Sequence, residues 1–412
     1  MIRTYGASFE KLYAAAVGTR LGDAARTSAV AVIGAGLTGD PAVLSLISAM
    51  SFAPWLIFGL PAGALVDRWD KRRAFLTADT VRCLLSVLLL AVAGLGQLSV
   101  GVLILFVFAL TTLQTVSDSC FNSLLPATVD NGRLGPANAR LSASQSTAGI
   151  VGAPLGSWLA SVSSTLPFLL NVLTFGAAAG WVGSLPASAA PRSAPARRGS
   201  WPRSLARDIR RGLGSLDRKG LLPVLLGCVT VNNFCNGLNS AVLPLLALHE
   251  LHLRPAEFGV LTGTNAGCMV LGNLLAGRLA VKRVPHQRAA ALAIALKAPG
   301  FLLVCAAGSP VVLVLGMAVL GLAAGLWNVP SSTLLMGSAP QETIGRVMAL
   351  FRTVSVAGMP LGAVTGGLVA SATGLRGSSL TAAVLSGAVL AGYLWRTRNL
   401  PVPAGSSAAG AD

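Results

Sequence analysis

Two long apolar runs meet at Gly63-Ala64-Leu65-Val66-Asp67-Arg68-Trp69-Asp70-Lys71-Arg72-Arg73, a stretch that carries six charges. Each charge at the centre of a bilayer costs roughly 2.5–3.5 kcal/mol on insertion scales, so this stretch must lie at a membrane face. The runs on either side are long enough to cross about 30 Å of hydrocarbon. We therefore interpret the stretch as a short turn between two transmembrane helices.

Composition places the rest of the chain in the same class. The 412 residues are 53% hydrophobic and only 11% charged, whereas about a quarter of the residues in a soluble domain are charged. The net charge of +17 comes largely from lysines and arginines between apolar runs, which is an orientation signal rather than a nucleic-acid footprint. We expect the lipid bilayer as a partner and no nucleic acid.

Apolar stretches long enough to span a membrane number about twelve. They are Leu12–Leu37, Pro41–Val66, Ala74–Gly96, Val100–Val129, Ala139–Val162, Pro167–Leu185, Leu221–Leu248, Ala256–Val281, Ala289–Ala307, Val311–Ser338, Arg346–Ala372 and Ser379–Arg396. The first span and the one ending at Val129 contain polar residues, so we expect a hydropathy window to score both weakly. The sequence predicts an all-α integral membrane protein.

A basic, Ala-, Ser- and Pro-rich segment divides the chain. We expect six-helix halves at residues 1–185 and 221–397, a basic cytoplasmic linker at 186–220 and a disordered tail at 398–412. Every second loop is rich in lysine and arginine, whereas the alternate loops hold little beyond Arg254 and Arg376. The positive-inside rule then places both termini and the linker in the cytoplasm of a multi-pass cell-membrane protein.

The two halves repeat each other. Leu60–Leu65 aligns with Leu274–Leu279 at a shift of 214, while a shift of 206 aligns Gly152–Gly156 with Gly358–Gly362, Asn122 with Asn328 and Arg140 with Arg346. Two parallel six-helix repeats are the architecture of secondary transporters that rock about a central site.

The charged stretch also carries a family resemblance. Its pattern Gly63-x-x-x-Asp67-Arg68-x-x-Lys71-Arg72 is similar to the signature of the major facilitator superfamily, with Asp70 where many members have glycine. Together with Gly22-Asp23 and Asp79-x-x-Arg82, Asp70 resembles the macrolide-efflux and enterobactin-exporter branch of drug:proton antiporters. The resemblance runs from Lys11 to about Arg396. It implies the major facilitator fold, in which helices one, four, seven and ten line a central cavity.

Charges inside the spans must pair or face water. Arg20, Asp23 and Arg26 recur every three residues and so share one face of the first span. Asp23 is interpreted as a proton-coupling site, with a static ion-pair cluster as the equally weighted alternative. The charges expected to fix helix packing are Arg20, Arg26, Asp79 and Arg82. Lys297, in the ninth span, is expected to have a structural and gating role.

A polar stripe on the fourth span holds Gln114, Asp118 and Asn122. Asp118 is the second proton-coupling candidate, against the alternative of a polar residue bonded to a neighbouring helix. The expected substrate cavity is lined by amides and an indole, at Gln114, Asn122, Asn232, Asn233, Asn236, Asn239, Trp327 and Asn328. Such groups suit a bulky, hydrogen-bonding amphiphile, and interhelical hydrogen bonding is their alternative role.

The opening stretch is expected to act as a cytoplasmic gate. By resemblance, Asp67 meets the start of the eleventh span near Arg346, where a helix N-terminus favours a carboxylate. Arg72 is expected to pair with Asp130. The whole expected gate comprises Gly63, Asp67, Arg68, Lys71, Arg72, Asp130, Arg140 and Arg346.

No enzyme constellation stands out. The three histidines lie near predicted loops without partners at ligand spacing, and the six cysteines lie inside apolar runs, so we expect no metal site. Without a phosphate-binding loop, ATP is not expected as the direct energy source. We expect a monomeric secondary transporter, without cofactors, that uses the proton gradient to export a small amphipathic drug, antibiotic or siderophore-like metabolite. Uptake symport and a non-transporting receptor or partner protein are the alternatives.

Overall fold

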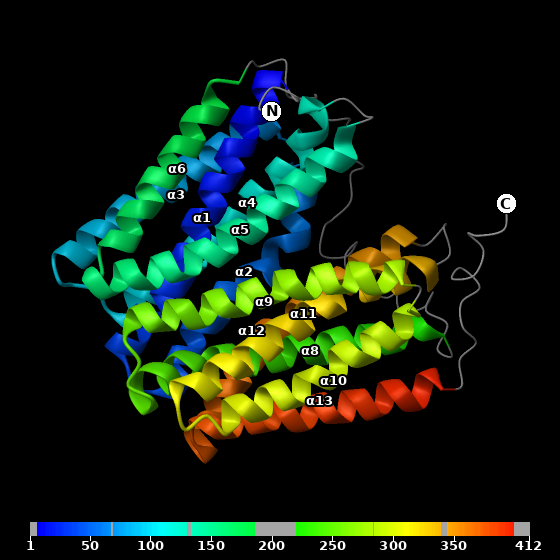
Figure 1. Ribbon diagram of the computed structural model, residues 1–412. Helices are drawn as coiled ribbons and strands as arrows, with labels where there is room; N and C mark the ends of the chain where they lie inside the picture. Colours follow the sequence, from blue (N-terminus) through cyan, green and yellow to red (C-terminus); the bar gives the residue numbers. More distant parts are fainter. Residues whose placement is uncertain are drawn as a thin grey trace. The chain divides into compact units, whose positions relative to one another are not determined.

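A computed structural model gives the fold (Figure 1). It describes residues 6–66, 69–129, 133–185, 220–282, 284–338 and 344–398. Within these ranges, side chains are described except at residues 60–66, 126–127, 134, 344–350 and 352–353. The predicted linker and the predicted tail therefore lie outside the described residues, apart from one residue of each.

The described part of the chain contains twelve α-helices, as the hydrophobic runs predict. The first six are α1 (Gly6–Leu37), α2 (Pro41–Val66), α3 (Lys71–Gly94), α4 (Val100–Thr128), α5 (Leu134–Val162) and α6 (Leu166–Gly183). The others are α8 (Leu221–Leu245), which the π-helical turn η3 (Leu246–Glu250) continues, α9 (Pro255–Val281), α10 (His286–Cys305), α11 (Pro310–Ser338), α12 (Ile344–Thr373) and α13 (Leu375–Thr397). The all-α membrane fold is confirmed.

Ten of these helices are long and apolar enough to cross a membrane by composition alone. The two others are α1, as expected, and α5, whose first half holds three serines together with Asn138, Arg140, Gln145 and Thr147. The expectation that the fourth span would also score weakly is wrong. Its polar residues gather towards its end, and an 18-residue window within Val100–Leu125 has a mean hydropathy of 2.1.

The charged stretch separates two helices as predicted, because α2 ends at Val66 and α3 begins at Lys71, with residues 67–68 outside the described part of the chain. Asp70 has extended backbone angles, and its carboxylate accepts a hydrogen bond from the Arg73 amide at 3.0 Å. This contact satisfies one of the free N–H groups at the helix start. The sequence prediction began this helix at Ala74, since it assigned the charged first turn to the loop.

The chain folds into two compact units. Unit 1 comprises Met1–Gly39, Met50–Arg198 and His252–Gly263, and unit 2 comprises Asp40–Ala49, Gly199–Leu251 and Thr264–Asp412. The start of α2 thus belongs to unit 2, and the start of α9 belongs to unit 1. The division into independent halves at 1–185 and 221–397 stays a prediction.

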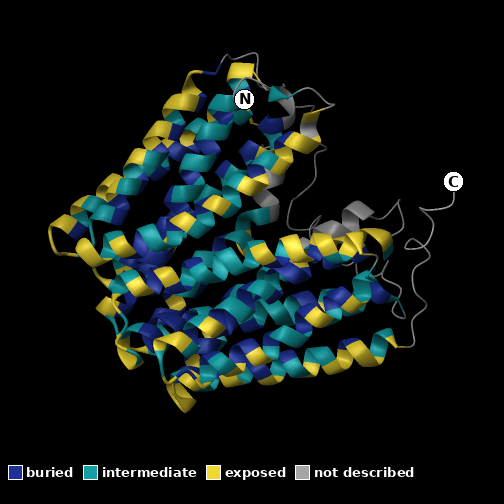
Figure 2. Cartoon of the chain, viewed as in Figure 1, coloured by how far each residue is buried: buried dark blue, intermediate teal, exposed yellow. Residues whose placement is uncertain are grey.

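Helix α3 has buried polar residues and exposed apolar residues, the reverse of the pattern in a helix of a soluble protein. Its polar residues Asp79, Arg82 and Ser86 are buried, whereas Leu84 and Leu88 are more than half exposed. Buried and exposed residues alternate along the helices with the helical period (Figure 2). Apolar side chains on the outside suit hydrocarbon, and the polar side chains inside must satisfy one another.

The repeated glycine blocks make equivalent contacts in the two units. A Cβ added to Gly156 of α5 would overlap the backbone of Ala25 in α1, and one added to Gly362 of α12 would overlap the backbone of Phe234 in α8. Gly152 and Gly358 are similarly close to α1 and α8. Absence of a side chain therefore lets the fifth helix of each half lie directly on the first.

We predict that Gly156→Leu lowers the stability of the detergent-purified chain by about 1–3 kcal/mol, because the new side chain must push α5 away from α1. Thermal unfolding with a fluorescent reporter measures the change. Gly149→Leu is the matched control on the same helix, since a Cβ there meets nothing within 4 Å. Equal losses in the two variants would contradict the packing argument.

Candidate functional site

A buried ion-pair network lies at the centre of unit 1. The guanidinium of Arg82 on α3 donates from Nη2 to Asp23 on α1 and from Nη1 to Asp79 at 3.0 Å. The Phe175 ring of α6 covers it, with its centroid 3.8 Å from the Arg82 Cζ. Arg82 and Asp79 are at most 1% exposed, and Asp23 is 6% exposed. One cation thus holds α1, α3 and α6 together.

Three further side chains, those of Arg26, Gln114 and Ser117, extend the network. Arg26 lies 3.4 Å from Asp23 and donates to Gln114 on α4 at 3.2 Å, and Ser117 of α4 donates to Asp79 at 3.0 Å. The structure therefore joins Asp23 to three of the four charges predicted to fix helix packing. Two carboxylates balance two guanidiniums, so the network has no net charge.

The fourth packing charge, Arg20, forms a separate pair with Asp118 of α4. The two side chains are 2.5 Å apart, and 27% of the Arg20 side chain and 15% of the Asp118 side chain are exposed. The second carboxylate oxygen of Asp118 is buried and has no hydrogen-bond partner among the described residues. Asp118 is therefore both less fully paired and less enclosed than Asp23.

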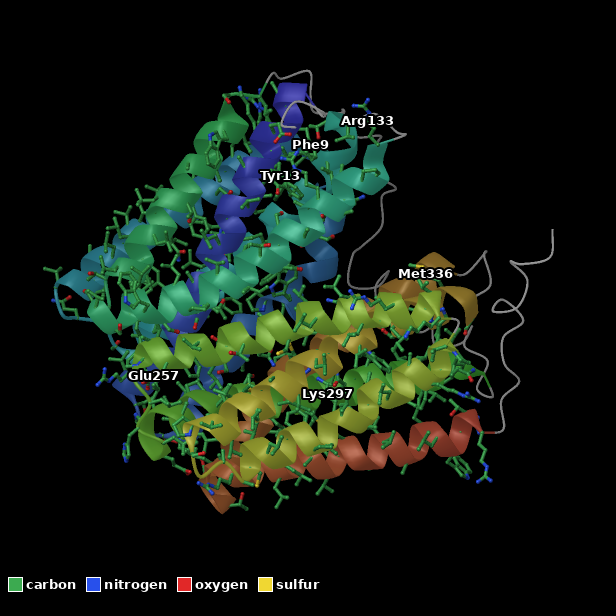
Figure 3. The ribbon with its side chains drawn as sticks, viewed as in Figure 1. Phe9, Tyr13, Arg133, Glu257, Lys297 and Met336 are labelled. Atoms are coloured by element: carbon green, nitrogen blue, oxygen red, sulfur yellow. The ribbon has the colours of Figure 1, made fainter. Side chains whose placement is uncertain are left out.

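A second inter-helix pair connects α5 to the start of α1. Arg140 donates to both carboxylate oxygens of Glu10, at 2.6 and 3.0 Å, and its Cζ lies 4.2 Å from the centre of the Tyr13 ring. Tyr13 and its neighbour Phe9 lie on the same helix (Figure 3). Sequence reasoning placed Arg140 in the gate and missed Glu10, although it is the only acidic residue before Asp23.

Three of the eight predicted gate residues, Asp67, Arg68 and Asp130, lie outside the described part of the chain. The helices at Gly63 and Arg346 are described, but the side chains there are not. Lys71 is the first residue of α3. Arg72 donates to the carbonyls of Val182 and Gly183, at 3.2 and 2.5 Å. These carbonyls end α6, where unpaired acceptors and the helix dipole favour a cation. The proposed Arg72–Asp130 pair stays a prediction.

The predicted amide lining of unit 2 divides among several helices. Asn233 donates to the Ser355 carbonyl of α12 at 2.8 Å, and Asn239 accepts from Ser379 of α13 at 3.2 Å. Asn328 of α11 donates to Asn273 of α9 at 3.3 Å. These three amides thus make interhelical hydrogen bonds, the alternative role considered above. In unit 1, Asn122 is exposed.

The remaining amides lie beside a buried lysine. Lys297 of α10 is 4% exposed, and its Nζ lies 3.5 Å from the Asn236 carbonyl oxygen (Figure 3). It lines a cavity in unit 2 together with Asn232 of α8 and Trp327 of α11. The structure therefore brings three predicted cavity residues, Asn232, Asn236 and Trp327, together with a lysine for which the sequence predicted a structural and gating role.

Curated relatives of the chain are efflux proteins. Macrolide efflux protein A of Streptococcus pyogenes is 24% identical over 344 residues, covering 82% of this chain and 83% of its own length. Macrolide efflux protein A of Enterococcus faecalis is 25% identical over 329 residues, covering 79% of this chain and 99% of its own length. The resemblance to the macrolide-efflux branch is confirmed.

Solved transporters share the fold at low sequence identity. A bacterial homologue of the human lysosomal transporter Spinster, inward-facing and unoccupied, superposes with a TM-score of 0.74 at 15% identity, covering 100% of both chains. A POT family transporter in complex with 5-aminolevulinic acid gives 0.75 at 9% identity, covering 96% of this chain and 97% of that one. The sequence profile of the Major Facilitator Superfamily matches residues 12–230 and 225–411, nearly the whole chain. The chain belongs to the Major Facilitator Superfamily of transporters.

Proposed function

We propose that the chain is a proton-coupled exporter of a small amphipathic drug, antibiotic or siderophore-like metabolite in the cytoplasmic membrane, with both termini inside the cell. The observation that carries the proposal is the incompletely enclosed Arg20–Asp118 pair between α1 and α4. The efflux named in the relatives supports the outward direction and makes a macrolide the first compound to test.

The Arg20–Asp118 pair can couple protonation to helix movement. Two unit charges 4 Å apart attract with about 4 kcal/mol at an effective dielectric constant near 20, and protonating the carboxylate removes that attraction. Because part of each side chain is exposed, a proton can reach Asp118 without unfolding the core. Loss of the pair would loosen α1 from α4. Asp118 is thus the first coupling residue.

Asp23 is the second candidate, with a different environment. Its Oδ1 oxygen faces both Arg26 and Arg82, so a proton there must displace two guanidiniums. We propose that Asp23, Asp79, Arg26 and Arg82 mainly fix the packing of α1, α3 and α4, and that Asp23 exchanges a proton only when this packing changes.

Asp118→Asn is expected to abolish gradient-driven export of a radiolabelled macrolide while the protein remains folded in the membrane. The amide keeps the size of the side chain and its hydrogen-bonding capacity but carries no exchangeable proton at physiological pH. Accumulation in cells with and without the protein measures export, and a protonophore is added to test coupling. Full export by Asp118→Asn would refute its coupling role.

The same assay separates the alternatives. Glu257→Gln is the charge-matched control, since this carboxylate accepts from the Arg254 amide at the start of α9, away from the ion-pair network. An exporter lowers accumulation until the protonophore is added, whereas an uptake symporter raises it. If several macrolides and unrelated amphiphiles accumulate equally with and without the protein, the exporter proposal fails.

Arg82→Met is expected to destabilise the purified chain by about 3–5 kcal/mol, because it leaves Asp23 and Asp79 buried without their shared cation. Thermal unfolding or membrane abundance measures the loss. Arg73→Met is the control, since this exposed arginine pairs only at the surface with Asp70 and such pairs contribute about 0–1 kcal/mol. Similar small losses in both variants would argue against the packing role.

A further inference from the structure

Lys297 is a buried cation without a counter-ion among the described residues of its own half of the chain. No described residue forms an ion pair with it, and its hydrogen-bond contact is the neutral Asn236. Helices α8, α10, α11, α12 and α13 contain no aspartate or glutamate in their sequences. Glu250, in the turn that continues α8, pairs with Arg376. An ammonium inside a membrane domain is expensive unless an anion or a polar cavity accompanies it.

The internal repeat shows what has changed around this cation. A shift of 215 pairs the first residues of α3 and α10 and also pairs Arg82 with Lys297. The equivalent glycine contacts pair Ala25 of α1 with Phe234 of α8, and the same register pairs Asp23 with Asn232, which lines the cavity beside Lys297. Ile294 occupies the place that corresponds to Asp79. The second half thus keeps the cation between its first and third helices and replaces both carboxylates with neutral residues. The resulting positive charge is unbalanced.

A cavity lies beside Lys297, whereas an aromatic ring covers Arg82 in unit 1. In unit 1 the Phe175 ring of α6 covers Arg82, whereas Lys297 lines a cavity bordered by the smaller Val389 of α13. Asn232, Trp327 and Ser386 also line it. An amide, an indole N–H and a hydroxyl are hydrogen-bond donors, and the described lining has no carboxylate. A buried cation with neutral donors around an open space has the chemistry of an anion site.

We propose that this cavity binds a monovalent anion, with Lys297 as its charged ligand and with Asn232, Trp327 and Ser386 as candidate donors. The anion is of halide or carboxylate chemistry, and either a free inorganic ion or the carboxylate of a small organic molecule supplies it. The bound anion balances the charge of Lys297, as the carboxylates of Asp23 and Asp79 balance the charge of Arg82. The site does not depend on the direction, substrate or coupling ion of transport.

Iodide quenching of Trp327 tests the site in the detergent-purified full chain at constant ionic strength, with isethionate as the bulky replacement anion. The signal of Trp327 is the difference between the chain and Trp327→Phe. We expect saturable quenching that Lys297→Met weakens at least about tenfold and Lys297→Arg retains. Lys11→Met, which removes a lysine of unit 1, should leave it unchanged.

Thermal unfolding gives an independent readout. Chloride should raise the Tm of the wild-type chain relative to isethionate, and Lys297→Met should abolish this difference while raising the Tm in isethionate. Arg82→Met should lower the Tm in both salts. Unsaturable quenching that is the same in Lys297→Met, or a chloride effect that survives this substitution, would overturn the proposal.

Competition with iodide distinguishes the two sources of the anion. Displacement by chloride at least as strong as that by acetate identifies an inorganic ion, whereas stronger displacement by acetate identifies an organic carboxylate. Displacement by neither, despite quenching of Trp327, would also overturn the proposal. Since none of these measurements involves transport, a failure here leaves the exporter proposal to its own test.

Discussion

Arg82 is buried between two carboxylates, and the packing of unit 1 depends on that arrangement. The guanidinium joins Asp23 of α1 to Asp79 of α3, and Phe175 of α6 closes its flat face. Each of these charges alone would oppose insertion into a bilayer, but together they form a neutral group. Lipid drives the association of apolar helices only weakly. The ion pairs therefore determine which helices pack together, since any other arrangement leaves a charge unpaired.

Close backbone contact makes this network possible. The α1 helix, which carries Asp23, meets α5 through Gly152 and Gly156, and Gly22 faces Thr174 of α6 where no Cβ would fit. Charged side chains have limited reach, so their pairing distances depend on how near the helix axes come. The close glycine contacts of α1 therefore bring its charged side chains within pairing distance of their partners. They fix α1 at the centre of unit 1.

Sequence patterns predicted the elements better than the contacts. The bounds of α2 were predicted to the residue, because apolar length and a charge cluster define a membrane helix, whereas α3 began earlier than expected since Asp70 caps a charged first turn. Helical periodicity put Arg20, Asp23 and Arg26 on one face but could not name their partners. Those partners lie on α3 and α4, and their distances depend on helix rotation and tilt, which hydrophobic patterns leave open. The sequence predicted Asn232 and Trp327 as cavity residues but did not predict that Lys297 lines the same cavity, for the same reason.

The two units differ in what their polar centres require. The charges of the network around Arg82 balance one another, although Asp79 Oδ2, Arg26 Nε and Arg82 Nε are buried without hydrogen-bond partners among the described residues. The Arg20–Asp118 pair is partly exposed, and Lys297 has no carboxylate partner among the described residues, so a proton or an anion changes the charge balance at these two groups. A transport cycle needs groups whose interaction energy depends on occupancy, because a ligand shifts an equilibrium only through differential affinity for its states. We therefore expect the cycle to act through Asp118 and Lys297, with the Arg82 network as the fixed frame against which they change.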